Sequence, residues 1–306
     1  MRVLITGGAG YIGSKLIQAL APQPKIEEIV IYDNLNRGNY NLFFCGNNQL
    51  RGKVKFVSGD ILDTRTLAKW VNHSDVIYHL AAKVLTPFAD QTPHEFDQVN
   101  NWGTAGLTYL VESSNVSHFI YLSSTSVYGA SEEKLTIDSN LQPRTFYGIS
   151  KKEGEDHVRR FLSGDKRTHI FRSANVYGYA PSLRFDSVVN KFMMEANFTS
   201  RIEVYGDGNQ MRSFIHVDRL SDFLSSLPFS DLKNGTYNLV ESSFAINDLV
   251  VELIRLYPEL EVIHANQGMK VRSLQVTPDD RILGIKSVDH DQLYRDLLKF
   301  KNHFSF

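Results

Sequence analysis

Short apolar runs alternate with longer amphipathic stretches along the first half of the chain. The apolar runs predict strands over Arg2–Thr6, Glu28–Asp33, Val54–Ser58, Val76–Leu80, Phe119–Ser123 and His169–Ser173. The stretches between them predict helices over Tyr11–Leu20, Thr64–Val71, Glu95–Ser113 and Tyr147–Phe161. Near-continuous apolar strands are typical of a parallel sheet that helices cover on both faces. The repeated order of strand, helix and strand therefore predicts a doubly wound parallel sheet of the α/β class, built from right-handed βαβ units.

The pattern changes after about Asn175. Turn-rich segments follow at residues 177–181 and 205–209, and two further helices are predicted over Ser187–Ala196 and Ile246–Leu256. We expect a doubly wound domain over residues 1–174, with later segments near 211–240 returning to it, and a smaller mixed α/β lobe over residues 175–306. Such a lobe would lie at the carboxyl ends of the strands, where open α/β sheets bind their ligands.

Charge and cysteine content narrow the classes of function. The chain has 33 Lys and Arg against 34 Asp and Glu residues, a net charge of -1. It lacks the basic excess of a nucleic-acid binder, although a local basic patch stays compatible with this balance. Cys45 is the only cysteine, and the first apolar run, Val3–Ile5, is shorter than a signal sequence or a membrane span requires. We therefore expect a cytoplasmic protein that acts on small molecules, without a nucleic-acid, membrane or metal partner.

A glycine-rich turn, Gly7-Gly8-Ala9-Gly10-Tyr11-Ile12-Gly13, separates the first predicted strand from the first helix. Gly7 permits a tight turn, Gly10 lets a pyrophosphate approach backbone N–H groups, and Gly13 lets the helix pack closely on the strand. The helix N-terminus adds partial positive charge for the phosphates. The glycine spacing alone also fits an ordinary turn, but its place between a strand and a helix indicates a dinucleotide site of the Rossmann type.

The next predicted strands end in carboxylates that would face the adenosine half of a dinucleotide. Asp33 ends the second strand, where it can accept hydrogen bonds from ribose hydroxyls. Because a carboxylate there repels a 2′-phosphate, the sequence favours NAD over NADP, and the nearby Arg37 weakens this preference without reversing it. Asp60, after the third strand, is placed to meet the adenine edge. A Rossmann domain that no longer binds its cofactor is the alternative interpretation.

Three hydroxyl and amine side chains are candidates for chemistry. Tyr147 and Lys151 are four residues apart, on one face of a predicted helix. A free Tyr titrates near pH 10, but a nearby ammonium and a nicotinamide positive charge favour phenolate and would lower that pKa. Ser124 ends the fifth strand, near the expected crevice. Taken singly, the Tyr–Lys pair also fits a helix surface, and Ser124 fits a cap or turn.

Together these motifs resemble the extended short-chain dehydrogenase/reductase family, specifically its NAD-dependent sugar-nucleotide epimerase/dehydratase branch. The resemblance runs from Met1 to about Asp222. Further matching segments are His79-Leu80-Ala81-Ala82, residues 100–104, residues 172–178 and residues 204–212. The resemblance implies an NAD-binding Rossmann domain and a smaller substrate-binding lobe.

The resemblance also implies roles for individual residues. Tyr147 would be the base, Lys151 would support it while holding the nicotinamide ribose, and Ser124 would hydrogen-bond the reacting sugar oxygen. The implied NAD contacts are Gly7, Gly10, Tyr11, Ile12, Gly13, Asp33, Asn34, Asp60, Ile61, Leu80, Ala81, Ala82, Asn100, Tyr147 and Lys151. The implied contacts to a nucleotide-diphosphate sugar are Ser124, Ser126, Asn175, Arg184, Asn190, Arg212 and Arg272. A homodimer through the helices near Glu95–Ser113 and Tyr147–Phe161 is expected by the same analogy.

Departures from the family pattern affect the choice of reaction. Dehydratases of this branch carry Thr-Asp-Glu where this chain has Ser124-Thr125-Ser126, so no carboxylic acid is available there to expel a hydroxyl as water. This favours a nucleotide-sugar 4-epimerase that passes through a transient 4-keto sugar. The alternatives are an NAD(P)-dependent 4-keto reductase or dehydrogenase on the same scaffold, and a non-catalytic NAD-binding sensor. His216 fits either an acid/base or a structural histidine on a strand.

Overall fold

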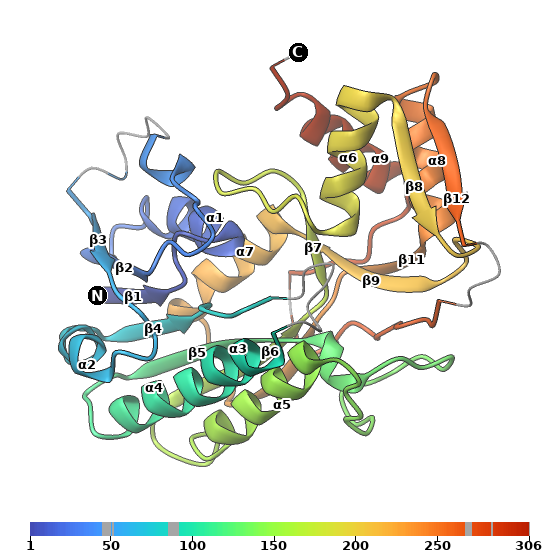
Figure 1. Cartoon of the computed structure of the whole chain (residues 1–306). Coiled ribbons are helices and arrows are strands. Elements are labelled where there is room, and N and C mark those ends of the chain that lie inside the picture. Colours follow the sequence, from blue (N-terminus) through green and yellow to red (C-terminus); the bar gives the residue numbers. More distant parts are fainter. Residues whose placement is uncertain (45–49, 51, 85–91, 267–270, 283, 306) are drawn as a thin grey trace.

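Seven parallel strands form the central sheet of the computed structural model, which describes all residues except 45–49, 51, 85–91, 267–270, 283 and 306 (Figure 1). Their order across the sheet is β10 (Gly235–Leu239), β6 (Arg167–Ser173), β5 (His118–Ser124), β4 (Val76–His79), β1 (Arg2–Thr6), β2 (Glu28–Asp33) and β3 (Val54–Ser58). The order reverses between β1 and β4, so the carboxyl ends of these two strands border the crevice where such sheets bind ligands. The prediction of a doubly wound, Rossmann-type parallel sheet is confirmed.

Helices cover both faces of this sheet, as its apolar strands require. α1 (Tyr11–Leu20) and α7 (Val217–Ser226) pack on one face, and α2 (Thr64–His73), α4 (Gly103–Glu112) and α5 (Phe146–Arg159) pack on the other (Figure 1). Each face has its own buried apolar cluster, which explains why residues 76–79 of β4 are all buried. No helix in the described part of the chain has the length and apolarity needed to cross a membrane.

The C-terminal segments build a smaller lobe around a separate apolar core (Figure 1). A three-stranded sheet has the order β11 (Ser242–Ala245), β9 (Met211–His216) and β7 (Asn175–Tyr177), and a parallel pair joins β12 (Glu261–Ala265) to β8 (Arg201–Tyr205). Helices α6 (Val188–Thr199), α8 (Ile246–Leu256) and α9 (His290–Lys301) pack with these strands. Short 3₁₀ turns lie at η1 (Asn41–Phe44), η5 (Thr125–Tyr128) and η6 (Leu227–Phe229).

The six predicted strands are present, with ends that differ by at most two residues. The predicted helix over Glu95–Ser113 is instead three consecutive pieces, α3 (Pro93–Phe96), the π-helical segment η4 (Asp97–Trp102) and α4. The prediction did not include α7 and α9, and it did not identify β10 as a strand. β10 pairs with β6, so residues 235–239 return to the large sheet after the chain has entered the C-terminal lobe.

Candidate functional site

The glycine turn lies between β1 and α1, at the carboxyl edge of the sheet. Gly7 has φ +72°, and its N–H donates to Tyr32 O at 2.9 Å. A side chain at Gly7 would collide with the backbone of Ala81, and one at Gly13 would collide with Gly8. Gly10 begins α1 without any side-chain cap and without an acidic residue in the first turn. These features leave an open N-terminal turn that suits an anionic group.

Asp33, at the end of β2, faces this turn. Its carboxylate accepts the N–H groups of Ala9 at 3.0 Å and Leu35 at 2.8 Å. Burial raises the pKa of Asp33, while these two backbone N–H groups oppose the rise. Asn34 donates to Asp60 at 2.9 Å, so three residues predicted on the adenosine side lie together. Ile61 is buried in the core beside them.

A buried hydrogen-bonded chain joins the β4 end to the π-helical segment. Thr104 donates to Asn100 O at 2.6 Å, so His79 Nε2–H must donate to Thr104 at 2.9 Å, and His79 Nδ1 accepts from Thr6 at 2.7 Å. Thr6 in turn accepts the N–H of Ala81 at 3.4 Å. Burial lowers the pKa of His79 to about 3, which matches this neutral form. This series of hydrogen bonds fixes the position of residues 80–82, where Leu80 and Ala82 are partly exposed.

Asn100 uses its amide to hold two other segments. Its Oδ1 accepts Lys83 N–H at 2.8 Å, and its Nδ2 donates to Lys83 O at 2.9 Å and Ser150 Oγ at 3.0 Å. Asn100 is 1% exposed. Its side chain therefore joins the segment after β4 to α5, one residue before Lys151.

Ser124 and Tyr147 meet where β5 ends and α5 begins. Thr145 caps α5 by accepting Gly148 N–H at 3.1 Å, which places Tyr147 in the first turn. Ser124 accepts Ser126 N–H and donates to Ser126 Oγ, both at 3.1 Å, and it hydrogen-bonds the Tyr147 phenol. The alternative role of Ser124 as a cap is thus present alongside its contact with Tyr147.

The pKa of Tyr147 moves in the direction opposite to the sequence expectation. Burial raises it, and the hydrogen bond with Ser124 and the positive charge of Arg184 only oppose that rise. The expected lowering by Lys151 is not what this structure shows. Burial lowers the pKa of Lys151 to about 7, while the carboxylate of Glu155 opposes this shift.

Several residues predicted to contact the ligands form hydrogen bonds within or to the loop after β7. Tyr11 donates to Gly178 O at 2.5 Å, and Asn190 accepts Gly178 N–H at 3.1 Å and donates to Arg184 O at 3.0 Å. Asn190 is fully buried. Ile12 packs against the same small apolar cluster as Tyr11.

Arg184 lies close to the catalytic candidates and is held by Asp186. Its Nε is 2.6 Å from Asp186 Oδ1, and Arg37 reaches the same oxygen at 3.4 Å. The positive charge of Arg184 opposes the rise that burial causes in the pKa of both Tyr11 and Tyr147, so this charge acts on the start of α1 and on the phenol.

The C-terminal lobe places Asn175, Arg212 and Arg272 on neighbouring segments. Asn175, on β7, donates to Ser213 O at 3.0 Å. Arg212, on β9, donates to Arg272 O at 2.8 Å, and the Arg272 side chain is exposed. Burial lowers the pKa of the Arg212 guanidinium. The two arginines therefore come together through one backbone contact.

The sequence profile described as "NAD dependent epimerase/dehydratase family" matches residues 3–239. The mouse (Mus musculus) protein "dTDP-D-glucose 4,6-dehydratase" is 32% identical over 266 residues, which cover 84% of this chain and 73% of that protein. The chain belongs to the NAD-dependent epimerase/dehydratase family. The resemblance stated from the sequence is thereby confirmed, and the chain is an NAD-dependent enzyme of this family.

Two further comparisons show the range within the family. The "Putative UDP-glucose 4-epimerase" of Methanocaldococcus jannaschii is 28% identical over 222 residues, 70% of this chain and 69% of that protein. The solved structure "MoeE5 in complex with UDP-glucuronic acid and NAD" is 25% identical with a TM-score of 0.81, and the match covers 99% of this chain and 98% of that chain. The relatives found by sequence thus carry the names of a dehydratase and of an epimerase, and the MoeE5 structure shares this fold.

The described residues fit the family's cofactor. The Gly7 and Gly13 positions that admit no side chain, the uncapped start of α1 and the Asp33 carboxylate are what a dinucleotide diphosphate and ribose need. Glycine spacing and strand ends predicted the residues that the structure brings together here, and their contacts with NAD stay a prediction.

Sequence reasoning missed two buried contacts behind the catalytic candidates. Glu155 of α5 pairs with Arg172 of β6 at 2.8 Å and accepts from Ser123 at 2.6 Å. Lys151 Nζ lies 4.2 Å from the ring centroid of Tyr121 on β5. Glu155 lies four residues after Lys151 on the same helix face, which was the available signal.

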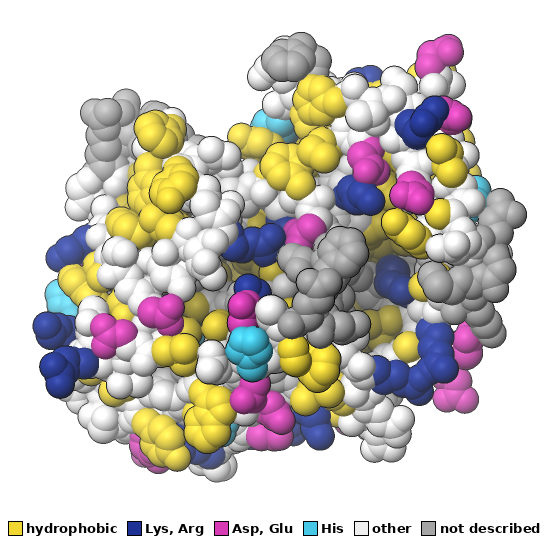
Figure 2. All heavy atoms as spheres, viewed as in Figure 1, with side chains coloured by type: hydrophobic (Ala, Val, Ile, Leu, Met, Phe, Trp, Pro, Cys, Tyr) yellow, Lys and Arg dark blue, Asp and Glu magenta, His cyan; other side chains and the backbone are white. Residues whose placement is uncertain are grey.

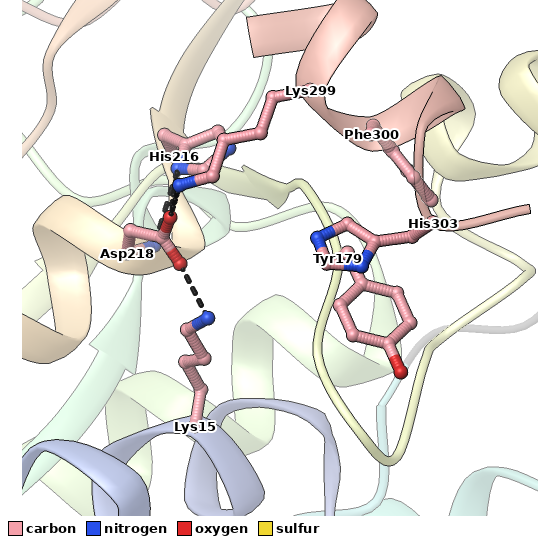
Figure 3. Close-up of a pocket in the computed structure, with 7 residues that line it drawn as sticks. All are labelled: Lys15, Tyr179, His216, Asp218, Lys299, Phe300 and His303. Atoms are coloured by element: carbon pink, nitrogen blue, oxygen red, sulfur yellow. Dashed lines mark hydrogen bonds and ion pairs between the residues drawn. The ribbon is translucent and has the colours of Figure 1, made fainter.

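A small pocket lies away from these residues, where α1, α7 and α9 meet. It is lined by Lys15, Tyr179, His216, Asp218, Lys299, Phe300 and His303, and Figure 3 shows Asp218 between the two lysines. His216 is 4% exposed, its Nδ1 accepts Asp218 N–H at 3.2 Å, and burial lowers its pKa to about 4. These contacts favour the structural interpretation of His216.

Proposed function

We propose that the enzyme is a 4-epimerase of a nucleoside diphosphate sugar. The observation that carries this proposal is the strand end beside Tyr147, where Ser124, Thr125 and Ser126 offer hydroxyl groups only. Oxidation and re-reduction at one carbon need a base and an oxygen-orienting hydroxyl. Loss of water needs an additional acid, and this strand end carries none.

The residues have distinct tasks in this reaction. Tyr147 removes the proton of the C4 hydroxyl and later returns it, and Ser124 hydrogen-bonds the C4 oxygen throughout. Lys151 holds the nicotinamide ribose, and the positive charge of Arg184 favours the Tyr147 phenolate. Bound NAD supplies the acceptor, and then the donor, of the C4 hydride. Between the two hydride transfers the 4-keto sugar rotates and presents its opposite face. The configuration at C4 is therefore inverted, and the cofactor is not consumed.

The C-terminal lobe would hold the rest of the substrate. In this proposal residues 1–174 bind NAD and residues 175–306 bind the sugar nucleotide. Arg212 and Arg272 grip the diphosphate, because a planar guanidinium can bond two phosphate oxygens at once. Asn175, Asn190, Arg184 and Ser126 complete the predicted contacts.

A 4,6-dehydratase is the second candidate, because the mouse relative carries that name. A keto-reductase or dehydrogenase on the same scaffold would change the absorbance at 340 nm steadily. A dehydratase product would be lighter than its substrate by one water, whereas an epimerase changes neither mass nor absorbance.

The test begins with a thermal-shift panel of UDP-, dTDP-, GDP- and CDP-sugars in the presence of NAD. The stabilising sugar is then followed by NMR and mass spectrometry. We expect a C4 epimer of unchanged mass, and Tyr147→Phe should lower turnover by several orders of magnitude while NAD still binds. A dehydrated product, or near-wild-type turnover of Tyr147→Phe, would contradict the proposal.

We also propose that the enzyme is a cytoplasmic homodimer. Trp102 and Tyr109 are 62% and 63% exposed near and on α4, and Phe146 and Ile149 are exposed on α5, where Figure 2 shows apolar side chains in the lower part of the view. Such a patch suits burial against a second copy. Trp102→Glu should yield monomers in sedimentation analysis, and an unchanged sedimentation coefficient would contradict this arrangement.

A further inference from the structure

The ammonium of Lys151 is buried against an aromatic ring. Lys151 is 2% exposed, and its Nζ lies 4.2 Å from the centroid of the fully buried Tyr121 ring. No hydrogen bond or ion pair holds Nζ among the described residues. At this distance a desolvated ammonium gains a substantial cation–π attraction. The ring of Tyr121 is thus the principal described contact of this charge.

The Tyr121 ring is itself fixed in position. His79 stacks on it with centroids 5.4 Å apart, and the Tyr121 hydroxyl lies 3.4 Å from Lys151 O. Gly154, one turn after Lys151, lies so close to the Tyr121 hydroxyl that any side chain at Gly154 would collide with it. His79 is hydrogen-bonded to Thr6, and Thr6 accepts the N–H of Ala81. The Tyr121 ring therefore lies between the segment beside the glycine turn and α5.

We propose that Tyr121 is a positioning residue that seats the Lys151 ammonium for NAD. This inference depends on the proposed role of Lys151 at the nicotinamide ribose. An ammonium has three N–H donors, and a ring face attracts its charge while taking up at most one of them, so the others stay available for ribose hydroxyls. A carboxylate in the same place would occupy the donors and would set a negative charge beside Tyr147, disfavouring phenolate.

The neighbouring carboxylate supports this division of tasks. Glu155 lies one helical turn from Lys151, but its oxygens are held by Arg172, Ser123 and Arg159. It therefore stabilises the Lys151 charge from a distance without pairing with Nζ. Among the described residues, the aromatic face of Tyr121 is what remains to fix the direction of the ammonium.

The test compares three variants by NAD affinity, measured by isothermal titration calorimetry without any sugar nucleotide. Tyr121→Phe keeps the ring and should bind NAD within about twofold of wild type. Tyr121→Leu should weaken binding about 10- to 30-fold, the range expected from a desolvated cation–π contact. Phe119→Leu is the matched control, because Phe119 is buried in the same apolar cluster on β5 and its ring packs against Phe161. It should lower the melting temperature and leave NAD affinity unchanged.

A double-mutant cycle separates positioning from general damage. If Tyr121 acts through Lys151, Tyr121→Leu should cause no further loss of affinity in a Lys151→Met background. An equal loss in both backgrounds, an equal loss in Phe119→Leu, or full affinity of Lys151→Met would each overturn the proposal. Since NAD affinity is read without a sugar, a wrong substrate assignment leaves the outcome unaffected.

Discussion

Tyr147 is subject to opposing influences that come from different parts of the chain. Burial raises its pKa, whereas the Ser124 hydrogen bond and the Arg184 charge lower it. Arg184 comes from the loop of the C-terminal lobe and is held by Asp186. The reactivity of a residue in α5 therefore depends on a loop that is distant in sequence.

Replacing Arg184 should move the pH dependence of turnover. Without the Arg184 charge the pKa of Tyr147 rises further, so the limb of the pH–rate profile that reports the base should shift to higher pH in Arg184→Gln, by up to about one pH unit. Arg184→Lys keeps the positive charge and should shift less. Superimposable profiles of wild type and Arg184→Gln, measured as log kcat against pH, would show that the charge does not act on the base.

At this scale the sequence predicts a role only where a residue lies in a short contiguous motif. The predicted roles of Gly7, Asp33 and Tyr147 follow from their distance to the end of one strand or the start of one helix. Tyr121 and Arg172 look like ordinary strand residues. Their contacts depend on which helix crosses which strand, and no local spacing encodes that crossing.

At the scale of elements, β5 and β6 are joined by a buried histidine pair. His169 Nε2–H donates to Leu232 O at 3.1 Å, so its Nδ1 accepts from His118 Nε2–H at 2.8 Å. Both rings are neutral in this arrangement. Burial lowers the pKa of His118 to about 3, because a protonated His118 would be desolvated and would lie beside His169 and the charge of Arg167.

This pair should make the fold sensitive to acid. The unfolded chain binds a proton at His118 near pH 6.5, whereas the folded chain resists it until about pH 3, so stability falls as the pH drops below about 6.5. Between pH 7.5 and pH 5, His118→Gln should lose about 1–2 kcal/mol less of its free energy of unfolding than wild type loses. Urea denaturation at several pH values measures this difference. His94→Gln, at an exposed position, should keep the wild-type slope, and a wild-type slope in His118→Gln would contradict the assignment.

The predicted elements failed where tertiary contacts override local pattern. The run over 95–113 has continuous helical periodicity, yet residues 97–102 widen into a π-helix. In this segment the Asn100 amide reaches Lys83 and Ser150. A π-helical segment of this kind is often found at functional sites. Short strands such as β7, with three residues, carry too few positions for their alternation to be distinguished from a loop.

For the whole molecule, the two lobes are joined by charges on the first turn of α7. Asp218 contacts Lys15 of α1 at 2.7 Å and Lys299 of α9 at 2.6 Å, as Figure 3 shows. The next residue, Arg219, pairs with Glu241 and Asp296. Burial opposes the charge of Asp218, but hydrogen bonds from the two lysines hold its pKa at about 2.

Asp218→Asn should therefore weaken the connection between α1 and α9. The contribution of the carboxylate is present above about pH 4 and disappears as the pH falls through about 2, so a loss of stability is expected at pH 7. Because Lys299 is largely exposed, we expect only about 1 kcal/mol, or about 2 °C in Tm by calorimetry. Asp222→Asn, on the same helix but exposed, should not lower Tm. Equal Tm values for wild type and Asp218→Asn would refute the role of this contact.

The pairing of β10 with β6 has a consequence for how the protein is made. On the ribosome, the dinucleotide sheet stays incomplete until residues 235–239 emerge, well after the glycine turn and Tyr147 have been synthesised. Until then β6 is an edge strand that carries the apolar Ile170 and Phe171, a surface prone to pairing with other chains. A fragment that stops near residue 174 would keep that edge permanently open. We therefore expect such a fragment to aggregate, even though it contains the whole glycine turn, Ser124, Tyr147 and Lys151.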